Sequence, residues 1–349
     1  MRRTISLLAA ALLFSTLALV ACTDSGTTSA SPSVSPSIPS PTTASPSATP
    51  HVAHQIAAVR EVPYMSEPEG GKDTNLLDVY APKDPGPWPV VVLCHGGGET
   101  KDGYEGWATR VAERGAVVYV PTWSRMNNDR GAKISAQELR EALVAAIGDI
   151  AAAVRFARGT AATYGGDPED LTLFGHSYGA MGVTMEAFSG IPAAESGLQG
   201  AGSAIPESLV IFDADYLLAS FGDGFLVDDP SLMHVFTPWD YLGRHVDFPI
   251  TMLDSVTPEL GRDASDAWVE GTWLDTRDPS GDLRQGLEAM GAFDDDLYLN
   301  GDGMKLLAER LRADGDTVTF ITLTDSTHWK LGPKGWESLL DALVPDGQT

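Results

Sequence analysis

Short apolar runs alternate with helical patterns along most of the chain from about residue 56 onward. The runs predict strands at residues 76–82, 89–98, 116–121, 170–177, 208–215, 248–254 and 317–324. Helices are predicted at residues 104–114, 136–158, 302–314 and 334–344. Strands that alternate with helices form a parallel sheet with right-handed crossovers. The pattern therefore predicts an α/β fold with a doubly wound, mostly parallel sheet flanked by helices.

Two stretches break this alternation, at residues 215–247 and 255–300. We interpret them as insertions near the carboxyl edge of the strands, where folds of this class bind their ligands.

The first 55 residues have a composition unlike the rest of the chain. A basic start precedes an apolar run from Ile5 to Ala21, which suits an export signal better than a membrane span. The sequence "LVAC" resembles a bacterial lipobox, and the resemblance implies cleavage before Cys22 and a lipid on that cysteine. Residues 22–55, rich in Ser, Thr and Pro, are predicted to be a disordered tether.

This reading predicts residues 1–21 as a lipoprotein signal peptide and residues 56–349 as the folded domain. We expect an exported protein, anchored to the outer face of the bacterial cell membrane through the lipid on Cys22. An uncleaved apolar anchor, or an ordinary signal peptide with an incidental cysteine, is the alternative.

Charge and cysteine content exclude several classes of function. The formal net charge is −25, which argues against nucleic acid as a partner. The chain has two cysteines, no CxxC motif and no Cys/His cluster, so we expect no metal site. No organic cofactor is implied either, and the oligomeric state stays open.

The stretch "LTLFGHSYGAMG", residues 171–182, contains a G-x-S-x-G motif between a predicted strand and helix-forming residues. This motif forms a tight strand-to-helix turn that exposes the hydroxyl of its serine, here Ser177, above the sheet. The flanking glycines are required where the strand and the helix press together. We therefore expect Ser177 to adopt a strained backbone conformation.

Three further features accompany the motif. The loop "HGGG", residues 95–98, follows a buried strand, and consecutive glycines let backbone N–H groups face an oxyanion. His328 follows the last predicted strand. Acidic residues lie between Ser177 and His328, in the order Ser, Asp, His.

With these motifs, the chain resembles the α/β-hydrolase superfamily, specifically the HGGG-type carboxylesterases and lipases, over roughly residues 60–345. The resemblance implies Ser177 as nucleophile and His328 as general base. It also implies an oxyanion hole formed by the backbone N–H groups of Gly97, Gly98 and Tyr178.

The acid of the triad is where the sequence departs from the family pattern. The expected glycine and aspartate do not follow residues 248–254 at the usual spacing, but a similar pattern occurs around residues 291–315. We favour Asp295 as the acid, with Asp254 as its rival.

The resemblance predicts a serine hydrolase that cleaves small-molecule carboxylic esters through an acyl-enzyme. A peptidase or an acyltransferase could use the same residues. We favour ester cleavage over peptide cleavage because no propeller-sized domain precedes the hydrolase domain. A catalytically inactive surface-binding protein on the same fold is the remaining alternative.

Overall fold

The computed structural model describes residues 52–65, 75–97, 99–123, 136–189, 204–214, 245–255 and 301–345. All of these ranges belong to one unit, Pro50–Thr349. The stretches proposed as insertions lie almost entirely outside the described residues, as do the export signal and most of the tether. None of the described helices is long and apolar enough to cross a bilayer.

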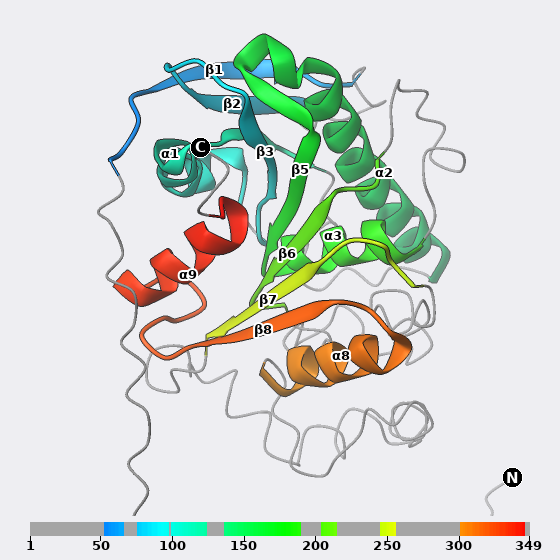
Figure 1. Cartoon of the computed structure of the whole chain (residues 1–349). Coiled ribbons are helices and arrows are strands. Elements are labelled where there is room, and N and C mark those ends of the chain that lie inside the picture. The colour runs from blue at the N-terminus through cyan, green and yellow to red at the C-terminus, as the bar shows by residue number, and fades with distance from the viewer. Residues whose placement is uncertain are drawn as a thin grey trace, which may run out of the picture. The chain divides into compact units, whose positions relative to one another are not determined.

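An eight-stranded sheet runs through the described residues in the order β1-β2-β4-β3-β5-β6-β7-β8 (Figure 1). The pairs β1–β2 and β2–β4 are antiparallel, and all other neighbours are parallel. The strands are β1 (Ile56–Pro63), β2 (Leu76–Pro82), β3 (Trp88–Cys94), β4 (Val117–Pro121), β5 (Gly166–His176), β6 (Ser208–Phe212), β7 (Ile250–Ser255) and β8 (Val318–Leu323).

Helices cover both faces of the sheet. The helices α1 (Glu105–Arg114) and α9 (Pro333–Leu343) lie on one face, and α2 (Ala136–Thr160), α3 (Tyr178–Ser189) and α8 (Gly301–Asp314) lie on the other (Figure 1). Short 3-10 helices, η1 (Lys101–Tyr104) and η2 (Ala161–Tyr164), precede α1 and β5. The predicted doubly wound, mostly parallel sheet is therefore confirmed.

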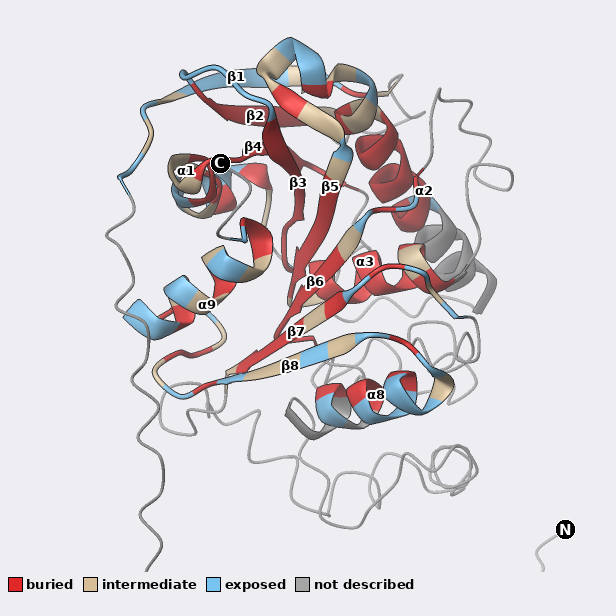
Figure 2. Cartoon of the chain, in the orientation of Figure 1, coloured by how far each residue is buried: buried red, intermediate tan, exposed pale blue. Residues whose placement is uncertain are grey.

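The two cores follow from the alternation of side chains along the central strands. Val90 and Val92 of β3 belong to the core that also contains residues of α2, α3 and α8, whereas Val91 and Leu93 belong to the core that contains residues of α1 and α9. Successive residues of a strand point to opposite faces, so a strand covered on both sides is apolar throughout. Figure 2 shows β3 buried along its whole length, as its continuous β-branched run predicts.

The predicted element boundaries agree closely with the structure. The range 76–82 coincides with β2, and the predicted helix at 136–158 corresponds to α2. Strand β1 was not predicted, because its residues are mostly exposed and give neither an apolar run nor a clear alternation. It is an edge strand that pairs only with β2 among the described strands.

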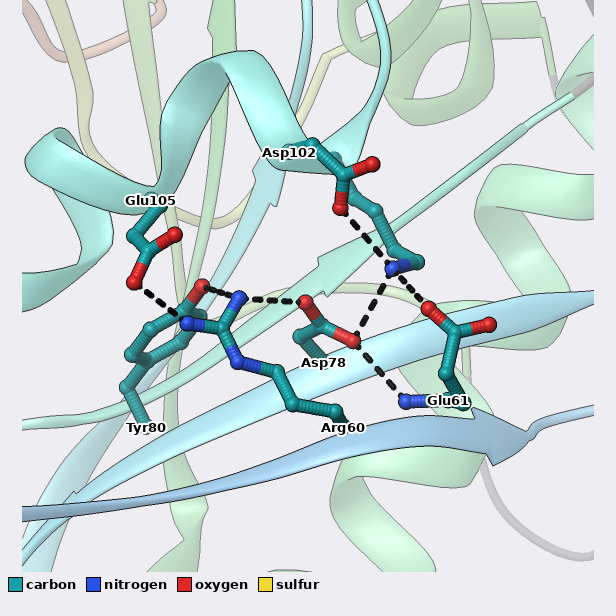
Figure 3. A network of polar contacts seen from close by, with 7 residues as sticks. Arg60, Glu61, Asp78, Tyr80, Asp102 and Glu105 are labelled. Carbon is teal, nitrogen blue, oxygen red and sulfur yellow. Dashed lines mark hydrogen bonds and ion pairs between the residues drawn. The ribbon is translucent and has the colours of Figure 1, made fainter.

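A polar network joins the edge of the sheet to the segment before α1 (Figure 3). Asp78 of β2 is fully buried, and its carboxylate is 2.8 Å from Arg60 Nη1 and 3.2 Å from Lys101 Nζ. Lys101 also pairs with Glu61 and Asp102. Burial alone would raise the pKa of Asp78, but the Glu61 N–H, Arg60 and Lys101 together lower it below its usual value.

Lys101→Met is expected to lower the free energy of unfolding by about 3 kcal/mol, because it leaves the buried Asp78 carboxylate with one cation instead of two. Urea unfolding of both proteins measures the difference. The matched control is Lys83→Met, an exposed position expected to change stability by less than about 0.5 kcal/mol. Equal losses in the two variants would contradict a structural role for the network.

A second buried ionisable group, Glu186, lies between α2 and α3. Burial raises the pKa of Glu186 in α3 to about 8, and the positive charge of Arg155 in α2 only partly opposes this. In the unfolded chain the same carboxyl titrates near 4.5. Between these two values the folded protein holds a proton that the unfolded chain has lost, so raising the pH destabilises the fold.

Each pH unit in this interval is expected to cost about 1.4 kcal/mol through Glu186. Glu186→Gln removes the titration, so the variant should lose less stability than the wild type between pH 5 and pH 8. Urea unfolding at both pH values measures this, with the exposed Glu169→Gln as a control that should follow the wild type. If Glu186→Gln and the wild type showed the same pH dependence of stability, the raised pKa of Glu186 would be refuted.

Candidate active site

Ser177 occupies the turn between β5 and α3 with a backbone φ of 56°, in the left-handed region. Residues with side chains rarely adopt this conformation, which costs on the order of 1–3 kcal/mol. The glycines on either side are needed for space. A Cβ atom on Gly175 would lie 2.4 Å from the carbonyl oxygen of Gly179, and one on Gly179 would lie 2.2 Å from that of Cys94. The strained turn predicted from the G-x-S-x-G motif is present.

His328 lies in the connection between β8 and α9, and its Nε2 is 2.9 Å from Ser177 Oγ. The connection is fixed against the start of α9 by Asp325, whose carboxylate accepts the backbone N–H groups of Lys334 (2.8 Å) and Gly335 (3.0 Å). The structure thus brings together Ser177 and His328, two site residues predicted from the sequence that are 151 positions apart.

Asp213 is the carboxylate that the structure places beside the other nitrogen of the histidine. It directly follows β6, has a φ of 48°, and its Oδ2 is 3.6 Å from His328 Nδ1. This separation suits an ion pair and is longer than a hydrogen bond. Ser255 at the end of β7 donates to Asp213 with its N–H (2.6 Å to Oδ1) and its hydroxyl (to Oδ2). The buried carboxylate is therefore held in one orientation.

Neither of the two acids predicted from the sequence, Asp254 and Asp295, is the carboxylate seen beside His328. Asp254 is buried near the end of β7, next to the Ser255 that supports Asp213. Asp295 lies outside the described residues. Asp213 was not predicted, because the glycine and aspartate pattern typical of the family occurs farther along the chain, around residues 291–315. The available signal was an aspartate directly after the buried run "LVIF", on the strand next to β5.

The glycine loop after β3 lies against the serine turn. A Cβ atom on Gly96 would be 3.1 Å from Ser177 Cβ, and one on Gly97 would be 3.4 Å from Tyr178 Cβ. Tyr178 begins α3, and its ring stacks on Trp123 at a centroid distance of 5.3 Å. The predicted donors Gly97 and Tyr178 are thus neighbours beside Ser177, whereas Gly98 lies outside the described residues.

Within the described ranges, no group of three or more His, Cys, Asp or Glu side chains is arranged to hold a metal ion. The described site offers three kinds of functional group, namely an oriented hydroxyl, an imidazole and main-chain N–H groups. That set suits nucleophilic attack on a carbonyl carbon.

The sheet order, the strained serine after β5 and the histidine after β8 define an α/β-hydrolase fold with a serine at the strand-to-helix turn. A model of the carboxylesterase family matches residues 35–210, which is half of the chain. The chain belongs to the carboxylesterase family.

Two esterases that match part of this chain support the family assignment. The chain is 29% identical to the para-nitrobenzyl esterase of Bacillus subtilis over 152 residues, which are 41% of this chain and 30% of that enzyme. It is 32% identical to a probable isoprenylcysteine alpha-carbonyl methylesterase of Oryza sativa over 117 residues, which are 32% of this chain and 25% of that protein. The matches therefore span less than a third of these relatives.

Solved structures of esterases share the fold at low sequence identity. Esterase B of Lactobacillus rhamnosis aligns with a TM-score of 0.53 at 16% identity, over 84% of this chain and 85% of its own. Esterase 2 of Thermogutta terrifontis gives 0.53 at 16%, over 83% of this chain and 95% of its own. A carbohydrate esterase from gut microbiota, in truncated form, gives 0.52 at 14%, over 84% and 96%.

Proposed function

We propose that the protein hydrolyses carboxylic esters of small molecules through an acyl-enzyme formed on Ser177. The observation that carries the proposal is the 2.9 Å separation of His328 Nε2 from Ser177 Oγ at the strained turn. Family membership and the esterase relatives support the same reaction.

In the first half of the reaction, Ser177 Oγ attacks the ester carbonyl carbon while His328 Nε2 takes the hydroxyl proton. The tetrahedral intermediate then collapses, and His328 returns this proton to the departing alcohol. In the second half, His328 takes a proton from water, whose oxygen attacks the acyl carbon. This second tetrahedral intermediate then collapses and releases the acid, while His328 returns the proton to Ser177 Oγ. Asp213 orients the ring of His328 and stabilises its positive charge in both halves.

The negative charge that forms on the carbonyl oxygen needs donors beside Ser177. We assign this role to the backbone N–H groups of Gly97, Gly98 and Tyr178. The close approach of the glycine loop to Ser177 and Tyr178 supports the assignment for Gly97 and Tyr178. Main-chain donors held by the fold need no reorganisation during the reaction, which is why they lower the barrier strongly.

Turnover of p-nitrophenyl acetate, before and after treatment with a fluorophosphonate, tests the proposal. We expect saturable release of p-nitrophenol that one equivalent of the fluorophosphonate abolishes. Product analysis with an added alcohol distinguishes hydrolysis from acyl transfer, because a transferase would give mainly the new ester. A protein that neither turns over esters nor reacts with the probe would contradict the proposal.

We also propose that the protein is exported and held at the outer face of the cell membrane by a lipid on Cys22. Support comes from the apolar run before "LVAC" and from the Ser/Thr/Pro-rich segment after it. Cell fractionation tests this proposal. Wild-type protein should sediment with membranes, and Cys22→Ser should not. Identical fractionation of the two proteins would contradict it.

A further inference from the structure

A chain of hydrogen bonds runs from the glycine loop to the main chain of His328. The N–H of Gly96 donates to the Tyr104 hydroxyl at 2.9 Å, and this hydroxyl is 2.5 Å from His176 Nδ1. His176 Nε2 is 2.7 Å from the backbone carbonyl oxygen of His328. Tyr104 ends η1, and His176 directly precedes Ser177. The chain thus links the loop, the serine turn and the histidine connection.

The direction of each bond follows from the partners. A carbonyl oxygen can only accept, so His176 Nε2 carries a hydrogen and donates to His328. In a neutral imidazole the other nitrogen then accepts, so the Tyr104 hydroxyl donates to Nδ1. The Gly96 N–H uses a lone pair of the same hydroxyl. Every group in the chain is satisfied only when His176 is the neutral Nε2–H tautomer.

Burial and ring packing favour this arrangement. The His176 ring stacks against Trp107 at 5.2 Å and against Phe212 at 5.0 Å, and Phe212 precedes Asp213. Burial, with a smaller contribution from the charge of His328, holds the pKa of His176 well below its usual range. Burial also raises the pKa of Tyr104, which keeps its hydroxyl protonated as a donor.

We propose that Tyr104 and His176 are positioning residues that hold the glycine loop at Gly96 and the main chain of His328 in register with Ser177. The proposal rests on the proposed esterase function and adds two residues to it. Neither side chain reacts with the ester. Their role is to fix the distance between the base and the oxyanion donors, on which turnover depends steeply.

Two substitutions of His176 separate the two ends of the chain. His176→Gln places an amide near the former Nε2 and can still donate to the His328 carbonyl. His176→Asn places an amide near the former Nδ1 and can still accept from Tyr104. Both remove the stacked ring, and each breaks one of the two hydrogen bonds: His176→Gln loses the bond to Tyr104, and His176→Asn loses the bond to His328. We expect each variant to lower kcat for p-nitrophenyl acetate at least about tenfold, with KM unchanged, because each breaks the connection at one end.

Tyr104→Phe tests the other end and has a matched control elsewhere in the fold. It should lower kcat about tenfold without changing KM. Tyr119→Phe is the control, because the Tyr119 hydroxyl is also buried and hydrogen-bonded, to Thr160 Oγ1, but belongs to β4 rather than to the chain of bonds. It should shift Tm by a similar amount and leave kcat unchanged. A wild-type kcat in Tyr104→Phe, or in either His176 variant, would overturn the proposal.

Nitrogen NMR of the His176 ring provides a readout that does not depend on turnover. At neutral pH we expect the neutral Nε2–H tautomer in the wild type, and a changed Nδ1 signal in Tyr104→Phe. A doubly protonated or Nδ1–H ring would overturn the proposal even in an active esterase. Conversely, the expected tautomer in a protein without ester turnover would refute the proposed function while leaving the chain of hydrogen bonds in place.

Discussion

Ser177→Ala is expected to lower kcat for p-nitrophenyl acetate by at least about 10⁴-fold, because no other group replaces the hydroxyl that accepts the acyl group. The substitution removes one oxygen from a strained turn, so the protein should stay folded. Residual activity above the rate in water would come from the oxyanion donors and from substrate binding alone. Steady-state kinetics of the purified protein measure the loss.

The matched control for this prediction is Ser338→Ala, a serine of α9 away from the turn. It should have wild-type kcat and KM. A Ser177→Ala variant that folds normally and keeps more than about a tenth of the wild-type kcat would show that the acyl group is not carried by this serine.

Asp213→Asn is expected to lower kcat by about 10²- to 10⁴-fold with a small change in KM. An amide keeps the shape of the side chain but loses the charge that stabilises protonated His328, and it allows the ring to adopt the wrong tautomer. The 3.6 Å separation is compatible with this role, because catalytic contacts often shorten when substrate binds. Kinetics at several pH values measure the effect.

Aspartate-to-asparagine substitutions at the two acids predicted from the sequence serve as the comparison for Asp213→Asn. Asp254→Asn and Asp295→Asn should each retain a kcat at least tenfold higher than that of Asp213→Asn. A larger loss at either position would move the role of the acid to that residue.

Much of the fold could be predicted from the sequence because its strongest signals are local. Buried strands such as residues 89–94 are continuous apolar runs, and the flanking helices repeat apolar residues every three or four positions. Strand β1 gives no such signal, since among the described strands it pairs only with β2 and most of its side chains are exposed. Its pairing with β2 depends on the completed sheet.

The candidate site likewise has a part that local sequence signals predicted and a part that depends on tertiary contacts. The serine turn was predictable because two glycines and a change from strand to helix lie within twelve residues of one another. The position of Asp213 beside His328 depends on how the end of β6 packs against the β8–α9 connection. The spacing of residues along the sequence does not predict this tertiary contact. The role proposed for His176 has the same origin, because its two partners come from η1 and from beyond β8.

Peptide mapping of the protein after reaction with a fluorophosphonate tests the central claim most directly. Wild-type protein should carry the label on Ser177, and His328→Ala should react at least about a hundredfold more slowly. A label on any other residue, or equal labelling rates in the wild type and His328→Ala, would contradict the assignment of Ser177 and His328 as nucleophile and base.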